Sequence, residues 1–291
     1  MSNENVGKNF ANVGVVGAGL MGSGVAEVCA LAGMQTTVIE ASPEAAEAGL
    51  ARIEKSLARG VRAGKRSDED VDAARSRLNI DNDLAALSEC DLVIEAIIEN
   101  EEAKIDLFTK LDQIVTSTDA VLASNTSSIP IMKLAMATSR PENVVGIHFF
   151  NPVPVLPLVE LVTSLHTSKN TKARAEHFAS DQLDKRVIVS QDRAGFIVNA
   201  LLIPYLLSAI RMYESGFASK EDIDDGMVAG CAHPMGPLHL TDLIGLDTTM
   251  AVAESLYAEF KEQLYAPPPL LARMCEAGLL GRKSGRGFYS Y

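Results

Sequence analysis

A glycine-rich loop near the N-terminus has the residue types and spacing that bind a pyrophosphate. Residues 17–22 read Gly-Ala-Gly-Leu-Met-Gly, after the apolar run Val13–Val16 and at the start of a predicted helix over Leu20–Ala32. Gly17 permits the tight turn, Gly19 lets backbone N–H groups approach the phosphates, and Gly22 lets helix and strand pack closely. The helix N-terminus adds a partial positive charge there. The candidate cofactor contacts in this loop are Gly17, Gly19, Leu20, Met21 and Gly22.

An acidic residue at the end of the second predicted strand fits the same cofactor. Glu40 follows the β-branched run Thr36–Ile39 and lies 21 residues after Gly19. A carboxylate there can accept hydrogen bonds from both ribose hydroxyls, and it repels a 2′-phosphate. The position favours NAD over NADP without excluding NADP. A tight turn beside an exposed acid is the alternative interpretation, and the complete pattern of strand, loop, helix and acid outweighs it.

A histidine and a glutamate have the types and positions for proton transfer. An enzyme that oxidises an alcohol needs a base, and the ordinary imidazole pKa of ~6.5 suits that task. His148 lies near the end of the predicted strand Val144–Phe150, where ligands of open α/β sheets bind. Glu160 follows 12 residues later in an apolar run, where a carboxylate needs a partner. Pairing would orient the ring and stabilise its imidazolium. A structural histidine and an edge-strand glutamate remain the open alternative.

A polar run ends another predicted strand. Residues 124–128 read Ser-Asn-Thr-Ser-Ser, so hydroxyls and an amide lie at the same sheet edge as the other candidates. Ser127 could polarise a carbonyl or hold a nicotinamide ribose. Alternatively, Ser127 or Ser128 caps the helix that begins near Ile129. The spacing of the histidines does not indicate a metal site.

The elements that must position these residues alternate between strand and helix. The continuously apolar strands are typical of a parallel sheet buried on both faces. Further predicted strands are Asp91–Ile97, Ala120–Ser124, Pro157–Thr163 and Arg186–Ser190. Helical patterns cover Pro43 to about Gly64, Glu101–Thr116 and Lys172–Leu183. Beyond residue 190 the pattern becomes helical. We therefore predict an α/β fold, with a Rossmann-like, mostly parallel NAD-binding domain over 1–190 and an all-helical domain over 191–291.

Composition excludes several classes of protein. The chain has 291 residues, 47% hydrophobic and 22% charged, which is typical of a globular protein. A net charge of −12 disfavours nucleic-acid and anionic-membrane partners. The four cysteines form no CxxC, the N-terminus has no signal-peptide pattern, and the 17-residue apolar stretch Ala194–Ile210 predicts a buried helix. These features predict a cytoplasmic protein.

The motifs together resemble the L-3-hydroxyacyl-CoA dehydrogenase family, most closely its short bacterial members that act on 3-hydroxybutyryl-CoA. GAGLMG, SNTSS, HFFNP, LVEL, GFIVN, HPMGPL and GRKSGRGFY occur in the expected order over nearly the whole chain. The resemblance implies reversible, NAD-dependent oxidation of a (3S)-3-hydroxyacyl-CoA to the 3-oxoacyl-CoA, in fatty acid metabolism. It also implies a homodimer formed through the helical domain.

Carried over by motif, the resemblance assigns individual roles. The family's catalytic serine falls on Ser127, its base on His148, the carboxylate partner on Glu160 and the substrate-orienting asparagine on Asn199. Besides the glycine loop and Glu40, the implied cofactor contacts are Glu99, Lys104, Ser127, Asn151 and Lys283. Ala200 and Ala63 stand where many relatives have arginine and lysine, and the second change puts one CoA phosphate contact in doubt.

A basic stripe offers a place for the phosphates of coenzyme A. Its members, spaced 3, 4, 3 and 4 residues apart on one predicted helical face, are Arg52, Lys55, Arg59, Arg62 and Arg66. The resemblance adds a CoA-binding serine, and the candidate substrate contacts are Ser56, Arg59, Arg62 and Lys65. A solvated helix face is the alternative interpretation.

Three rival functions fit the same scaffold. The first is oxidation of a free hydroxy acid, as in the gulonate dehydrogenases related to λ-crystallin, and the basic stripe argues against it. The second is an enzyme acting on acyl carrier protein thioesters. The third is a non-catalytic NAD(P)-binding or structural protein, which the retained serine, histidine, glutamate and asparagine disfavour.

Overall fold

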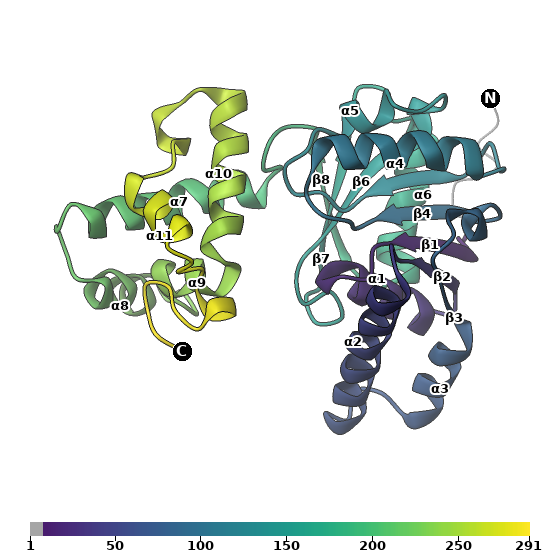
Figure 1. Ribbon diagram of the computed structural model, residues 1–291, viewed down its shortest axis with the longest axis horizontal. Coiled ribbons are helices and arrows are strands. Elements are labelled where there is room, and N and C mark those ends of the chain that lie inside the picture. The colour runs from purple at the N-terminus through teal and green to yellow at the C-terminus, as the bar shows by residue number, and fades with distance from the viewer. Residues whose placement is uncertain (1–7) are drawn as a thin grey trace. The chain divides into compact units, whose positions relative to one another are not determined.

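The computed structural model describes residues 8–291, and the chain divides into two compact units at Arg193 and Ala194. The first unit alternates strands and helices, and the second is built from helices (Figure 1). The strands of the first unit are β1 (Asn12–Val16), β2 (Gln35–Ile39), β3 (Leu78–Asp81), β4 (Leu92–Glu95), β5 (Val121–Ser124), β6 (Val144–Phe149), β7 (Leu158–Thr163) and β8 (Arg186–Gln191). Its helices are α1 (Leu20–Leu31), α2 (Pro43–Arg62), α3 (Asp68–Arg77), α4 (Glu101–Ile114), α5 (Ile131–Ala135) and α6 (Lys169–His177).

The strands form one eight-stranded sheet in the order β3-β2-β1-β4-β5-β6-β7-β8. Neighbouring strands are parallel except β6 and β7, which are antiparallel. The predicted mostly parallel, Rossmann-like sheet is therefore confirmed. Strand β1 has β2 as its neighbour on one side and β4 on the other, so the strand order reverses direction at β1. The crevice at the carboxyl ends of β1 and β4 is where open α/β sheets bind their ligands.

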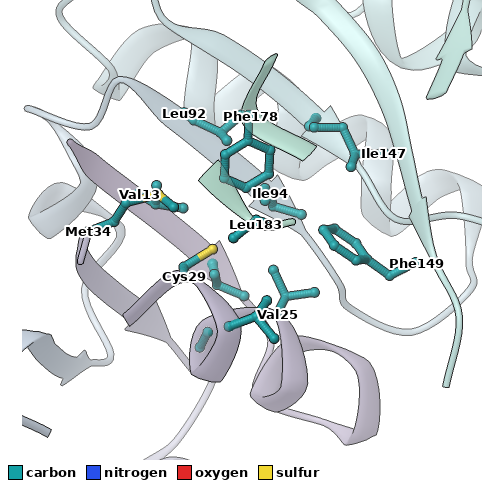
Figure 2. Close-up of a cluster of buried hydrophobic side chains, with 14 of the residues drawn as sticks. Val13, Val25, Cys29, Met34, Leu92, Ile94, Ile147, Phe149, Phe178 and Leu183 are labelled. Carbon is teal, nitrogen blue, oxygen red and sulfur yellow. The ribbon is translucent and has the colours of Figure 1, made fainter. Parts of the chain in front are cut away.

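Helices cover both faces of the sheet. On one face Val25 and Cys29 of α1 and Phe178, just after α6, pack against strand residues such as Val13 and Leu92 (Figure 2). Helices α4 and α5 lie on the other face (Figure 1). With both faces covered, the central strands carry apolar residues at nearly every position, which is why their sequences lack a polar alternation.

Local signals explain most of the helix boundaries. Ser42 caps α2 by accepting a hydrogen bond from the N–H of Ala45, and Pro43 occupies the first helical position. The sequence did not predict α3 or β3. Strand β3 is a short, partly exposed edge strand without an apolar run, and α3 is a mostly polar helix that buries only Val71 and Ala74. Helix α2 ends at Arg62 with Ala63 as its C-cap, close to the predicted end near Gly64. Arg66, the last residue of the stripe, lies beyond the helix.

The second unit packs five helices around its own apolar core. They are α7 (Val198–Glu214), α8 (Lys220–Cys231), α9 (Pro237–Ile244), α10 (Leu246–Phe260) and α11 (Pro269–Glu276). Leu207 and Ile210 of α7 are buried against residues such as Leu256 of α10, as expected for the apolar stretch Ala194–Ile210. Among residues 8–291, no helix has the length and apolar composition that a membrane crossing requires.

Candidate active site

The glycine loop between β1 and α1 has room only for glycine at two of its positions. Gly17 has φ +95°, and a Cβ there would lie 2.6 Å from the carbonyl oxygen of Ala96. A Cβ on Gly22 would lie 1.8 Å from the carbonyl oxygen of Gly17, so any larger residue would displace the loop. At Gly19, by contrast, a Cβ would meet nothing within 4 Å. The loop backbone is thus open at the N-terminus of α1, as a pyrophosphate site requires.

Two charged side chains hold the loop at Ala18. Glu40, directly after β2, accepts a hydrogen bond from the Ala18 N–H with Oε1 at 2.5 Å and from the Ala41 N–H with Oε2 at 3.1 Å. Arg52 of α2 donates to the Ala18 carbonyl oxygen at 3.0 Å. The carboxylate predicted to bind ribose therefore lies at the edge of the glycine loop. Arg52, grouped with the basic stripe, contacts the cofactor loop.

His148 and Glu160 form a buried pair across β6 and β7. They are directly opposite in the antiparallel register, and His148 Nδ1 lies 2.8 Å from Glu160 Oε2. Glu160 is 0% exposed and His148 6%. If Nδ1 carries the proton that this carboxylate accepts, Nε2 has the lone pair that a base needs. The ring of Phe150 lies 4.6 Å away, centroid to centroid.

The alternative interpretation of this pair is wrong in one respect. Strand β7 is not an edge strand, because β8 pairs with its far side from Leu158 to Thr163. Glu160 is therefore a carboxylate in the interior of a sheet, where burial is costly unless hydrogen bonds compensate it. The apolar run around Glu160 had indicated that its carboxylate needs a partner, and His148 is that partner.

The Ser124–Ser128 turn is tied to neighbouring strand ends. Asn125 Oδ1 accepts a hydrogen bond from the N–H of Phe149, which joins the turn to the end of β6 beside His148. The N–H groups of Ser127 and Ser128 donate to Glu99 Oε1 at 3.0 and 3.1 Å. Glu99 thus holds the backbone of the candidate catalytic serine.

The helix-capping interpretation of the two serines is wrong. Helix α5 has no side-chain N-cap, and its first N–H groups, on Ile131 and Met132, donate to the carboxylate of Asp192 at 2.8 and 2.7 Å. The serine hydroxyls therefore are not used to satisfy the start of that helix.

A buried lysine joins two acids next to this turn. Lys104 of α4 is 1% exposed, and its Nζ lies 3.0 Å from Glu95 Oε1 and 2.6 Å from Glu99 Oε2. Burial alone would raise the pKa of Glu99, but the Lys104 charge and hydrogen bonds from Thr126 and Ser128 outweigh it and lower that pKa. Sequence reasoning missed Glu95, although an acid inside an apolar run, here the predicted strand Asp91–Ile97, is the same signal that singled out Glu160.

Asn151 lies in the exposed loop between β6 and β7. Lys185, just before β8, stabilises this loop, because its Nζ donates to the carbonyl oxygens of Val153 at 2.6 Å and Leu156 at 2.8 Å. Burial lowers the pKa of Lys185. The loop that carries a predicted cofactor contact is therefore anchored by a lysine that the sequence did not single out.

The basic stripe faces a buried acid of α1. Glu27 accepts a hydrogen bond from Ser56 and interacts electrostatically with Arg59 and Arg66, and burial raises its pKa. Arg66 lies beyond the end of α2, and its side chain runs alongside Gly60. Arg59, Arg62 and Lys65 are exposed. These three cations are therefore accessible to an anion such as a phosphate. The hydroxyl of Ser56, by contrast, is already hydrogen-bonded to Glu27.

Two predicted site residues belong to the second unit. Asn199 is partly buried in the first turn of α7. Lys283 forms an ion pair with Asp247 at the start of α10.

The fold and the site define a class. A parallel sheet with a glycine loop after its first strand and an acid after its second is a dinucleotide-binding fold. A buried histidine–carboxylate pair lies at the same edge of the sheet, and an imidazole so paired has the chemistry that a base for an alcohol substrate needs. The first unit is that of a dinucleotide-dependent oxidoreductase.

Comparison with known proteins identifies the family. Residues 12–193 match the NAD-binding domain of 3-hydroxyacyl-CoA dehydrogenase, and residues 195–291 match its C-terminal domain. The chain belongs to the 3-hydroxyacyl-CoA dehydrogenase family. This confirms the predicted family and the predicted NAD cofactor.

Individual relatives cover almost the whole chain. It is 60% identical to 3-hydroxybutyryl-CoA dehydrogenase of Mycobacterium tuberculosis, over 96% of this chain and 98% of that protein. It is 45% identical to a probable 3-hydroxybutyryl-CoA dehydrogenase of Bacillus subtilis, over 95% and 96% of the two chains. The solved (S)-3-hydroxybutyryl-CoA dehydrogenase of Ralstonia eutropha matches with a TM-score of 0.92 and 44% identity, over 97% and 99% of the two chains.

Proposed function

We propose that this chain catalyses the reversible NAD-dependent oxidation of (3S)-3-hydroxyacyl-CoA to 3-oxoacyl-CoA, with 3-hydroxybutyryl-CoA as its substrate. The observation that carries this proposal is the buried pair of His148 and Glu160, 2.8 Å apart at the edge of the sheet that bears the glycine loop. The names of the relatives support the short acyl chain, because the three relatives compared above are all described as 3-hydroxybutyryl-CoA dehydrogenases.

In the proposed reaction the protein supplies a base and alignment. His148 Nε2 takes the proton of the 3-hydroxyl group as the C3–O bond becomes a carbonyl, and Glu160 stabilises the resulting imidazolium. Ser127 and Asn199 orient the substrate oxygens. Bound NAD supplies the acceptor for the hydride that leaves C3. In the reverse direction the same histidine returns the proton to the carbonyl oxygen.

The residues around the glycine loop fit NAD. The backbone at Gly19 is open, and the N-terminus of α1 has no side-chain cap, so its N–H groups are available to a pyrophosphate. The carboxylate of Glu40 already accepts a backbone N–H at the loop, so a 2′-phosphate placed beside it would meet a negative charge. This arrangement supports NAD as the preferred cofactor.

Reduction of acetoacetyl-CoA tests the function directly. Initial rates with NADH and NADPH are measured in parallel, and free acetoacetate and an acetoacetyl thioester of acyl carrier protein serve as competing substrates. We expect the highest kcat/KM with acetoacetyl-CoA and NADH. Preference for the free acid or for the carrier-protein thioester would replace the proposal by one of those activities.

Charge reversal on α2 tests the proposed CoA contacts. We expect the double variant Arg59→Glu, Arg62→Glu to raise the KM for acetoacetyl-CoA about tenfold or more, because like charges then face the CoA phosphates. The kcat should change little. A matched control reverses two exposed cations elsewhere, Lys110 and Arg273. An equal KM for both double variants would show that the stripe is only a solvated helix face.

We also propose a homodimer that forms through the helical unit. Leu201 is 73% exposed and Phe217 78% exposed on this unit, and burying such large apolar side chains would favour association of two chains. Sedimentation equilibrium should give about twice the 31.1 kDa chain mass. Phe217→Glu should shift the protein toward monomer, whereas a wild-type monomer at micromolar concentration would contradict the proposal.

A cytoplasmic location is the remaining part of the proposal. All four cysteines are free thiols, and Cys29 and Cys90 are buried, as suits a reducing compartment. Recovery of the protein in a secreted or periplasmic fraction would contradict this location.

A further inference from the structure

Glu95 is a buried acid that neither the motifs nor the proposed mechanism uses. It is the last residue of β4 and is 0% exposed. Its Oε1 accepts the N–H of Ile97 at 2.7 Å and lies 3.0 Å from Lys104 Nζ, and its Oε2 accepts the hydroxyl of Ser124 at 2.5 Å. A carboxylate so far from water persists only with compensating partners, and all of these partners lie at the cofactor edge of the sheet.

Two routes connect Glu95 with the turn that carries Ser127. The first runs through Ser124, whose Oγ accepts the N–H of Thr126 at 3.1 Å. The second runs through Lys104 to Glu99, whose Oε1 accepts the N–H groups of Ser127 and Ser128. Both routes end on the backbone at residues 126–128. The position of Ser127 is therefore linked to one carboxylate on a different strand.

The charges of the network make Glu95 more than a packing residue. Lys104 is shared between two acids, so loss of the negative charge on Glu95 would leave its ammonium to Glu99 alone. Lys104 already contacts Glu99 at 2.6 Å, so loss of its second acid would change the charge balance of this pair and, with it, the position of Glu99 against the turn. Burial raises the pKa of Glu95, and Lys104 together with the Ser124 hydroxyl opposes that rise.

We propose that Glu95 is a positioning residue that sets the Ser124–Ser128 turn for cofactor and substrate through Lys104, Glu99 and Ser124. The inference rests on the proposed function for the role of Ser127, but the geometry that it predicts does not depend on turnover. No atom of Glu95 needs to touch substrate or cofactor. Its effect passes through the backbone N–H groups that Ser124 and Glu99 hold.

The test compares Glu95→Gln with Glu101→Gln. Glutamine keeps the shape of Glu95 but removes its charge, whereas Glu101 is an exposed acid on the same side of the sheet that pairs with Lys133. Hydrogen exchange of the peptide covering residues 124–129 is followed by mass spectrometry without cofactor. We expect exchange about tenfold faster in Glu95→Gln and unchanged in Glu101→Gln, because the Ser127 and Ser128 N–H groups lose protection.

Binding and kinetics supply the second readout. NADH fluorescence titration should show weaker binding to Glu95→Gln, and kcat for acetoacetyl-CoA should fall about 10- to 100-fold, as expected when a reacting group is misplaced. In a double-mutant cycle with Glu99→Gln, the combined loss should be smaller than the product of the two single losses. A combined loss equal to the product of the two single losses would show that Glu95 does not act through Glu99.

The outcomes separate this inference from the proposed function. A lower Tm with unchanged exchange, NADH binding and kcat would overturn the inference and leave Glu95 a structural acid. If Glu95→Gln does not fold, Ser124→Ala removes one bond of the same network, and unchanged exchange at 124–129 in that variant would overturn it as well. If the wild-type protein does not reduce acetoacetyl-CoA, the proposed function fails, and exchange and NADH binding still decide the role of Glu95.

Discussion

We expect His148→Gln to lower kcat for acetoacetyl-CoA reduction by about 10²–10⁴-fold, the usual contribution of a general acid–base group. Glutamine can still donate a hydrogen bond to Glu160, so the buried carboxylate keeps a donor and the fold is preserved. An alanine would remove that donor, and breaking a buried pair costs ~3–5 kcal/mol. NADH binding, measured by fluorescence titration, should stay nearly unchanged, because the glycine loop and Glu40 are untouched.

A second histidine–carboxylate pair provides the matched control. His239 Nδ1 lies 2.6 Å from Asp224 Oδ2 in the helical unit, and His239 is not part of the proposed catalytic machinery. His239→Gln should therefore lower the Tm with little change in kcat. Near-normal turnover by His148→Gln, or an equal kcat loss in both variants, would refute the role of His148 as the base.

We expect Glu160→Gln to lower kcat by about 10³-fold or more, by analogy with the loss seen when the aspartate of a hydrolase triad becomes an amide. If the glutamine amide donates to Nδ1, it holds His148 in the tautomer with the proton on Nε2, which cannot act as the base. The neutral amide also cannot balance the charge of the imidazolium. The two residues act as a unit, so the double variant with His148→Gln should be no slower than the worse single variant. Steady-state rates of the three variants check this.

Stability measurements separate catalysis from packing at Glu160. The side chain is buried inside the sheet, so some loss of Tm is expected whatever its role. A mild effect on kcat, with the loss confined to Tm, would instead assign Glu160 a packing role. A kcat loss that simply multiplies with that of His148→Gln would show that the two residues act separately.

The sheet could be predicted because its signals are local. Continuous apolar strands such as Val144–Phe149, and helix caps such as Ser42, depend on neighbouring residues alone. Strand β3 could not be found in this way, because Leu78–Asp81 is a strand only through its pairing with β2. Arg66 was grouped with the α2 stripe because its spacing continues that of the helix, although the helix ends at Arg62.

The site shows the same division between local and non-local information. His148 and Glu160 were accessible to sequence reasoning because they lie on consecutive strands, where an antiparallel connection places them opposite each other. The contact of Arg52 with Ala18 and the proximity of Ser56 to Glu27 join residues from different helices and loops. Spacing along one helix could not show which of its cations face a ligand and which face the protein.

The role of His148 as the base can be checked in the structure of a complex. A crystal structure of the chain with NAD⁺ and acetoacetyl-CoA would show whether the buried imidazole reaches the reacting oxygen. We expect His148 Nε2 within hydrogen-bond distance of the 3-keto oxygen, about 2.6–3.2 Å, with Nδ1 still bound to Glu160. A substrate whose 3-keto oxygen lies away from His148, with another side chain at that distance, would contradict that role.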